Sequence, residues 1–160
     1  MKLDVLAIGV HPDDVELSCA GVLLMEKSRG KKTGIIDLTR GELGTRGTAE
    51  TRDKEAADAA KVLGVEVREN LGMADGFFEK NKENQLKIIH MLRKYQPDIV
   101  LCNSVDDRHP DHGRSAKLVS DAAFLSGLRK IETMENGSLQ DAWRPAYVLH
   151  YLQDYYHHPD

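Results

Sequence analysis

Five short apolar runs, separated by segments with helical character, constrain the fold of this chain more than any other feature. Each run is bounded by turn residues, which is typical of strands buried on both faces; the runs cover residues 3–10, 33–39, 65–71, 98–103 and 145–152. The intervening segments predict helices over residues 14–30, 48–63, 83–95 and 115–128. Strands that alternate with helices predict an α/β fold, in which helices cover both faces of a mostly parallel sheet.

Length and composition limit the classes of protein to consider. The 160 residues suit a single domain spanning residues 1–160. The 22 basic and 26 acidic residues give a net charge of −4, which argues against nucleic acid as a partner. Cys19 and Cys102 lie in apolar segments and are expected to be reduced core residues. The N-terminus fits neither a signal peptide nor a membrane span, so we expect a soluble cytoplasmic protein.

The expected strand order brings two unusual polar segments together. If the strands are ordered 3-2-1-4-5, as in doubly wound sheets, the first and fourth strands are neighbours and their carboxyl ends flank a crevice. The sequence HPDD at residues 11–14 follows the first strand, and RHPDH at residues 108–112 follows the fourth. Both segments should therefore line the same crevice.

Two histidines and a carboxylate from these segments predict a metal site. We assign His11, Asp14 and His112 as ligands. Three protein ligands leave a coordination position open, as in catalytic zinc sites and unlike structural ones. The residue types favour Zn²⁺ and leave Fe²⁺ or another divalent metal open.

The remaining polar residues of the two segments suit acid–base chemistry. Asp13 could accept a proton from an attacking water. His109 could stabilise a tetrahedral oxyanion or protonate the leaving group, and Asp111 could orient His109 and hold it protonated. Arg52 and Arg108 could bind an anionic part of the substrate. Together these residues indicate metal-assisted hydrolysis of an amide or ester.

Simpler interpretations compete with each of these assignments. Asp13 or Asp14 could cap the first helix, at about 1 kcal/mol, and His-Pro-Asp also occurs in ordinary turns. Arg52 and Arg108 could equally be surface residues. The glycines of residues 41–47 could form a flexible or substrate-facing loop. Nucleotide binding, the alternative that the fold class suggests, lacks both GxGxxG and GxxxxGK[ST]. A terminal cluster of His157, His158 and Asp160 is expected to be a frayed end.

The motifs together resemble one family. HPDDVELSCAG after the first strand, GE within GELGTRG, TRDKEA at the start of the second helix and DDRHPDH after the fourth strand resemble the LmbE-like (PIG-L) N-acetylglucosaminyl deacetylases. They are most similar to the branch that deacetylates N-acetylglucosaminyl malate in bacillithiol biosynthesis. The resemblance implies a Rossmann-like three-layer sandwich without a nucleotide, and zinc-dependent removal of acetate from an N-acetylglucosamine unit.

Carried over to this sequence, the resemblance implies the same ligands, His11, Asp14 and His112, and Asp13 as the general base. It implies that His109 stabilises charge with support from Asp111. Arg52 then falls where the family has an arginine implicated in substrate binding, and Arg108 would pair with a malate carboxylate. The family's domains usually continue beyond the point where this sequence ends, so we expect the C-terminal part of the family domain to be missing here.

The resemblance also leaves alternatives open. Trimers or hexamers are common in the family, which makes a homo-oligomer an expectation here. Other candidate functions are a deacetylase or amidase acting on another amino-sugar or thiol conjugate, and a non-catalytic metal- or sugar-binding module.

Overall fold

The computed structural model describes residues 1–156 and 158 of the chain, and its centre is a five-stranded parallel sheet. The strand order is β3-β2-β1-β4-β7, which confirms the predicted order. The strands are β1 (Val5–Gly9), β2 (Thr33–Thr39), β3 (Val67–Met73), β4 (Ile99–Asn103) and β7 (Tyr147–Tyr151). The fold class predicted from the strand and helix pattern is therefore correct.

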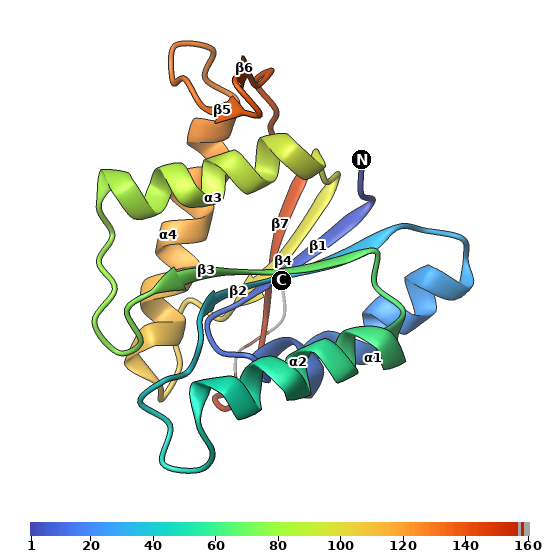
Figure 1. Cartoon of the computed structure of the whole chain (residues 1–160), viewed down its shortest axis with the longest axis vertical. Helices are drawn as coiled ribbons and strands as arrows, with labels where there is room; N and C mark the ends of the chain where they lie inside the picture. Colours follow the sequence, from blue (N-terminus) through green and yellow to red (C-terminus); the bar gives the residue numbers. More distant parts are fainter. Residues whose placement is uncertain (157, 159–160) are drawn as a thin grey trace.

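Four helices complete the three layers (Figure 1). One face of the sheet carries α1 and α2, and the other carries α3 and α4. Their bounds are α1 (Asp14–Ser28), α2 (Ala49–Leu63), α3 (Lys82–Tyr95) and α4 (Pro110–Ser126). Because all five strands are parallel, their carboxyl ends lie at the same edge of the sheet.

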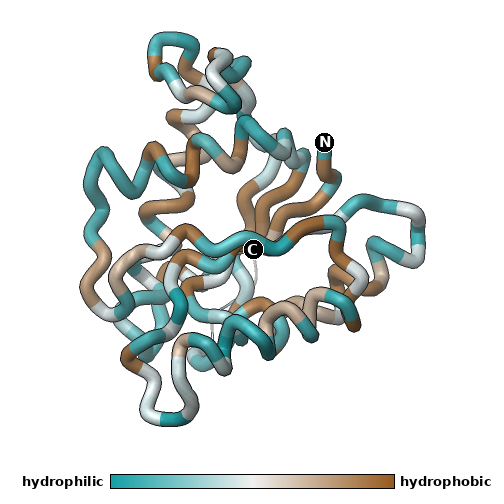
Figure 2. The backbone as a smooth tube through the Cα atoms, viewed as in Figure 1, coloured by the Kyte–Doolittle hydropathy of each residue, from teal (hydrophilic) through white to brown (hydrophobic). Residues whose placement is uncertain are grey.

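The central strands are the most apolar part of the molecule, as Figure 2 shows. Every residue of β1 and of β2 is buried. Burial on both faces explains why these runs lack the alternation of a half-exposed strand. Each large aliphatic side chain buried there, such as Leu6 or Ile36, contributes about 2 kcal/mol of transfer free energy.

Several elements differ from the expected ones. The third strand is Val67–Met73 rather than residues 65–71, because the Val65 N–H still bonds back to the Ala60 carbonyl oxygen at the end of α2. A small hairpin, β5 (Met134–Glu135) and β6 (Ser138–Leu139), lies in the segment expected to be a loop. The helix α4 starts at Pro110, five residues before the expected start at Ser115.

The early start of α4 has a local cause. His109 is the N-cap, its Nδ1 accepts a hydrogen bond from the Asp111 backbone N–H (3.3 Å), and Pro110 occupies the first helical position. Proline favours that position because its fixed φ and missing N–H cost nothing there. The predicted ligand His112 thus lies on the first turn of a helix rather than on a loop.

The start of α1 differs from the interpretation in which Asp13 or Asp14 caps the helix. Asp13 is the N-cap residue, but its side chain makes no capping hydrogen bond. The Asp14 carboxylate turns back instead, and its Oδ2 accepts hydrogen bonds from the backbone N–H groups of Val10 (3.0 Å) and His11 (3.1 Å). Neither aspartate is therefore a side-chain cap of α1.

Other expectations concern the cysteines and the chain end. Cys19 and Cys102 are buried and form no disulfide, as predicted. His157 and Asp160, of the expected terminal cluster, lie outside the described residues. Within the described part of the chain, no helix has the length and apolar character needed to cross a bilayer.

Candidate metal and active site

The three predicted ligands meet at the carboxyl ends of β1 and β4. One candidate ligand atom from each of His11, Asp14 and His112 lies within 4.8 Å of the others. The His11 Nδ1 is 3.7 Å from Asp14 Oδ2, and the His112 Nε2 is 3.3 Å from Asp14 Oδ1. The sheet therefore brings HPDD and RHPDH together, as the strand order predicted.

The surroundings of Asp14 keep its carboxylate ionised and fixed. Oδ2 accepts three hydrogen bonds, from two backbone N–H groups and from the Asn103 side-chain amide (3.0 Å). Burial alone would raise the pKa of Asp14, but hydrogen bonds with His11 and His112 hold that pKa well below its usual range. Oδ1 accepts one hydrogen bond, from Gln153 Nε2 (3.0 Å), and so keeps more capacity than Oδ2 to face a cation.

Two further carboxylates, Asp75 and Asp107, orient the histidines. Asp75 Oδ1 lies 3.0 Å from His11 Nε2, and Asp107 Oδ1 lies 3.1 Å from His112 Nδ1. Each imidazole thus has one nitrogen beside a supporting carboxylate and the other directed at Asp14. This arrangement is common around metal ions, because the carboxylate fixes the tautomer and ring orientation of the ligand.

The same carboxylates affect the basicity of the two rings. Burial alone would lower the pKa of His11 and of His112, but Asp14 raises both above the ordinary value of histidine. Asp75 adds to this effect at His11, and Asp107 adds to it at His112. Without a metal ion, the site therefore favours protonated imidazoles next to its carboxylates.

The charge and donor set of the site fit a divalent cation. The carboxylates of Asp14, Asp75, Asp107 and Asp111 are all at most 6% exposed. Asp111 pairs with Arg114 (2.8 Å), whereas Asp107 Oδ2 is buried without a hydrogen-bond partner among the described residues. Buried negative charge needs compensation, and two imidazoles with one carboxylate oxygen are the ligands of a catalytic zinc site.

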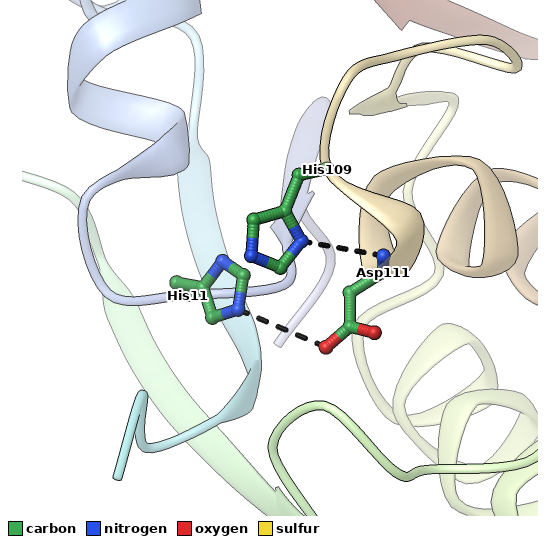
Figure 3. A group of neighbouring side chains, drawn as sticks. All are labelled: His11, His109 and Asp111. Atoms are coloured by element: carbon green, nitrogen blue, oxygen red, sulfur yellow. Dashed lines mark hydrogen bonds and ion pairs between the residues drawn. The ribbon is translucent and has the colours of Figure 1, made fainter. Parts of the chain in front are cut away.

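His109 and Asp111 lie next to His11 (Figure 3). The ring centroids of His11 and His109 are 4.8 Å apart, and Asp111 Oδ2 is 3.9 Å from His11 Nε2. Because His109 Nδ1 accepts a hydrogen bond from the Asp111 backbone, the neutral ring carries its proton on Nε2.

The Asp111 carboxylate makes its hydrogen bonds away from the His109 ring. Its carboxylate accepts hydrogen bonds from the Gly76 N–H and Arg114, and only its backbone N–H bonds to His109. The pKa of His109 is lowered, first by burial and then by the positive charges of His11 and His112. Asp111 therefore contacts His109 through the helix backbone, and its negative charge favours the protonated ring without outweighing the effect of burial.

The predicted base and the two arginines lie at the opening of the site. The Asp13 side chain is half exposed, and its Oδ2 lies 3.5 Å from Arg52 Nη2. Arg52 rests against Gly41 and Gly44, and a methyl group on Gly41 would collide with its guanidinium. Arg108 is exposed and pairs with Asp154.

A cavity of about 400 Å³ connects these groups. Seven of the eight predicted site residues line it, and Asp111 lies behind them: the lining includes His11, Asp13, Asp14, Arg52, Arg108, His109 and His112. The sequence-based prediction missed Asp75, Asp107 and Gln153. Asp107 stands within the DDRHPDH motif itself, where its position beside the histidines was the available signal. Nothing local in the sequence distinguishes Asp75 or Gln153.

Comparison with known proteins agrees with this geometry. The family model described as PIG-L, GlcNAc-PI de-N-acetylase, matches residues 6–123. The uncharacterized deacetylase YaiS of Escherichia coli strain K12 is 31% identical over 114 residues, which are 68% of this chain and 61% of that protein. The chain therefore spans less than two thirds of the length of this curated relative.

Solved structures show the same fold. The conserved protein TT1542 from Thermus thermophilus is 41% identical with a TM-score of 0.89, and the match covers 98% of this chain and 69% of that one. The N,N'-diacetylchitobiose deacetylase from Pyrococcus horikoshii is 26% identical with a TM-score of 0.81, over 92% of this chain and 59% of that one. On the family match and the identity to YaiS, the chain belongs to the PIG-L (LmbE-like) deacetylase family.

Proposed function

We propose that this chain is a metal-dependent N-deacetylase that removes acetate from an N-acetylglucosaminyl conjugate. One observation carries the proposal: the triad His11, Asp14 and His112 lines the same cavity as Asp13, a carboxylate that is close to the triad but not needed as a ligand. A binding module would need the triad but not the neighbouring acid–base groups. Family membership supports the same reaction.

Zn²⁺ is the proposed metal, and Fe²⁺ is the alternative that the ligand types allow. Bound to the triad, the ion supplies a Lewis acid that polarises the amide carbonyl and makes water more acidic. Asp13 takes the proton of the water that attacks the acetyl carbonyl carbon. The Nε2–H of neutral His109 donates a hydrogen bond to the oxyanion. When the C–N bond breaks, the amine nitrogen takes up the proton that Asp13 accepted, and acetate leaves.

The proposed substrate is N-acetylglucosaminyl malate, on the basis of the motif resemblance. Its malate carboxylates require cationic partners, and Arg52 and Arg108 line the cavity on the solvent side of the triad. Arg52 is held in place by the Gly41 turn and by Asp13, whereas Arg108 would exchange Asp154 for the substrate carboxylate. Assembly into a trimer or hexamer and a cytoplasmic location remain predictions.

Acetate release tests the proposal. The zinc-loaded chain should release acetate from N-acetylglucosaminyl malate faster than from N-acetylglucosamine or from a sugar linked to a thiol. The control is Asp13→Ala, loaded with zinc to the same occupancy. The proposal is wrong if no N-acetylglucosaminide yields acetate, or if Asp13→Ala is as active as the parent. Faster turnover of the thiol conjugate would indicate that a thiol conjugate, and not the malate conjugate, is the substrate.

A further inference from the structure

The segment that follows β7 returns to the metal site. Gln153 lies two residues after Tyr151, the last residue of that strand, and its side chain lines the same cavity as the triad. Its neighbour Asp154 pairs with Arg108. This segment therefore contacts both polar motifs, although neither its sequence nor its spacing resembles a ligand motif.

Gln153 forms a closed set of hydrogen bonds with Asp14 and Asn103. Its Nε2–H donates to Asp14 Oδ1 (3.0 Å), and its Oε1 accepts from the Asn103 Nδ2 (2.9 Å). The same Asn103 Nδ2 donates to Asp14 Oδ2 (3.0 Å). Asn103 is fully buried at the end of β4, where its Oδ1 also accepts a hydrogen bond from Ser115. The Gln153 amide is thus held through Oε1 by Asn103 of the sheet and through Nε2 by the Asp14 carboxylate.

The two oxygens of Asp14 differ in what holds them. Three N–H donors fix Oδ2. Oδ1 faces His112 Nε2, and Gln153 is the one side-chain amide among the described residues that bonds to it. Oδ1 keeps a second lone pair for a cation. A donor on this oxygen fixes the rotation of the carboxylate about its Cβ–Cγ bond, and so the direction of that lone pair.

We propose that Gln153 is a positioning residue that directs Asp14 Oδ1 toward the metal ion. The inference rests on the metal site of the proposed function and adds a residue to it. Hydrogen-bonding partners of metal ligands commonly change metal affinity by about 10- to 100-fold. Gln153 acts on the ligand and need not touch substrate.

The test is the zinc affinity of Gln153→Met, which keeps the length of the side chain and removes its amide oxygen and nitrogen. The matched control is Gln140→Met, since the Gln140 amide donates to the His90 carbonyl oxygen on α3 (3.1 Å) and lies outside the triad cavity. Chelator competition should show at least about tenfold weaker zinc binding for Gln153→Met. The affinity of Gln140→Met should equal that of the parent.

Co²⁺ spectra separate positioning from folding. The visible absorption of the Co²⁺-loaded protein reports ligand geometry, so its bands should change in Gln153→Met and not in Gln140→Met. Gln153→Asn retains the amide but is too short to reach Oδ1. If Gln153→Met folds poorly, Gln153→Asn replaces it in the test and should show the same weaker zinc binding and changed Co²⁺ bands. Circular dichroism of the metal-free proteins checks folding.

The outcomes distinguish this inference from the proposed function. Parental zinc affinity and parental Co²⁺ bands in a folded Gln153 variant would overturn the role of Gln153. Failure of the parent to bind either metal at micromolar concentration would overturn both the role of Gln153 and the metal site. Tight zinc binding without acetate release would overturn only the deacetylase proposal.

Discussion

Asp107 lies 3.1 Å from Nδ1 of His112, the ring nitrogen opposite the one that faces Asp14. Its Oδ1 also accepts the backbone N–H of His109 (2.9 Å), so one carboxylate supports the ligand and the N-cap of the same helix. The supporting carboxylate and the ligand come from a single short motif. The helix start at Pro110 sets the distance between them.

Asp107→Asn should weaken zinc binding by about 10- to 100-fold. The amide keeps the shape of the side chain but removes the negative charge that makes the His112 imidazole a stronger ligand for zinc. Isothermal titration with Zn²⁺ measures the effect. Asp98→Asn is the matched control, because Asp98 pairs with Lys2 on the surface (2.9 Å). Equal zinc affinity of the two variants would show that Asp107 does not support zinc binding.

The sequence predicted the sheet order, and with it the proximity of His11, Asp14 and His112, because both depend on patterns that few folds can satisfy. Fully buried β1 and β2 leave little choice about the central strands, and strands one and four then place HPDD beside RHPDH. The ligand types in those motifs allow few other chemical roles. The strand order and the residue types of the two motifs therefore point to the same site.

The parts that sequence could not predict depend on side-chain contacts between distant segments. Asp75 reaches His11 from the turn after β3, and Gln153 reaches Asp14 from beyond β7. An isolated aspartate or glutamine in a polar segment is usually solvated, so its residue type carries no signal. The way in which Asp111 contacts His109 could not be predicted for a related reason, because this bond uses a backbone N–H.

Asp13→Asn should retain zinc and lose activity by about 10²- to 10⁴-fold. The change removes a proton acceptor, whereas the triad of His11, Asp14 and His112 is unchanged. Metal analysis together with acetate-release rates checks both parts. His112→Ala is the contrasting variant and should lose most of its zinc at micromolar concentration. Full zinc occupancy in His112→Ala would refute the ligand assignment.

Gly41→Ala should reproduce the effect of losing Arg52. Gly41 has φ of 62°, and a Cβ there would overlap the Arg52 guanidinium. We therefore expect weaker substrate binding, seen as a higher KM, in addition to a loss of about 1 kcal/mol from the left-handed backbone. Gly30→Ala is the matched control, because Gly30 has φ of 79° and its Cβ would meet nothing within 4 Å. Both variants should lose similar stability in urea, and only Gly41→Ala should change KM. An unchanged KM would show that Arg52 does not bind substrate.

The pH dependence of stability should reverse when zinc is bound. In the metal-free protein the pKa values of His11 and His112 are raised, so each ring binds its proton more tightly in the folded state than in the unfolded state. Their contribution to stability is fully present below the unfolded pKa of about 6.5 and is lost as the pH rises through the folded values.

With zinc, the same rings must be deprotonated to bind, so rising pH strengthens binding and stabilises the folded protein. Thermal unfolding midpoints should therefore diverge: the metal-free midpoint falls above a pH of about 6.5, whereas the zinc-bound midpoint rises up to about that pH and stays level above it. Calorimetry of chelator-treated and zinc-saturated protein across this range measures both curves. The variant His112→Asn should flatten the metal-free curve and remove most of the zinc effect. Parallel curves with and without zinc would show that the ion does not bind through these imidazoles.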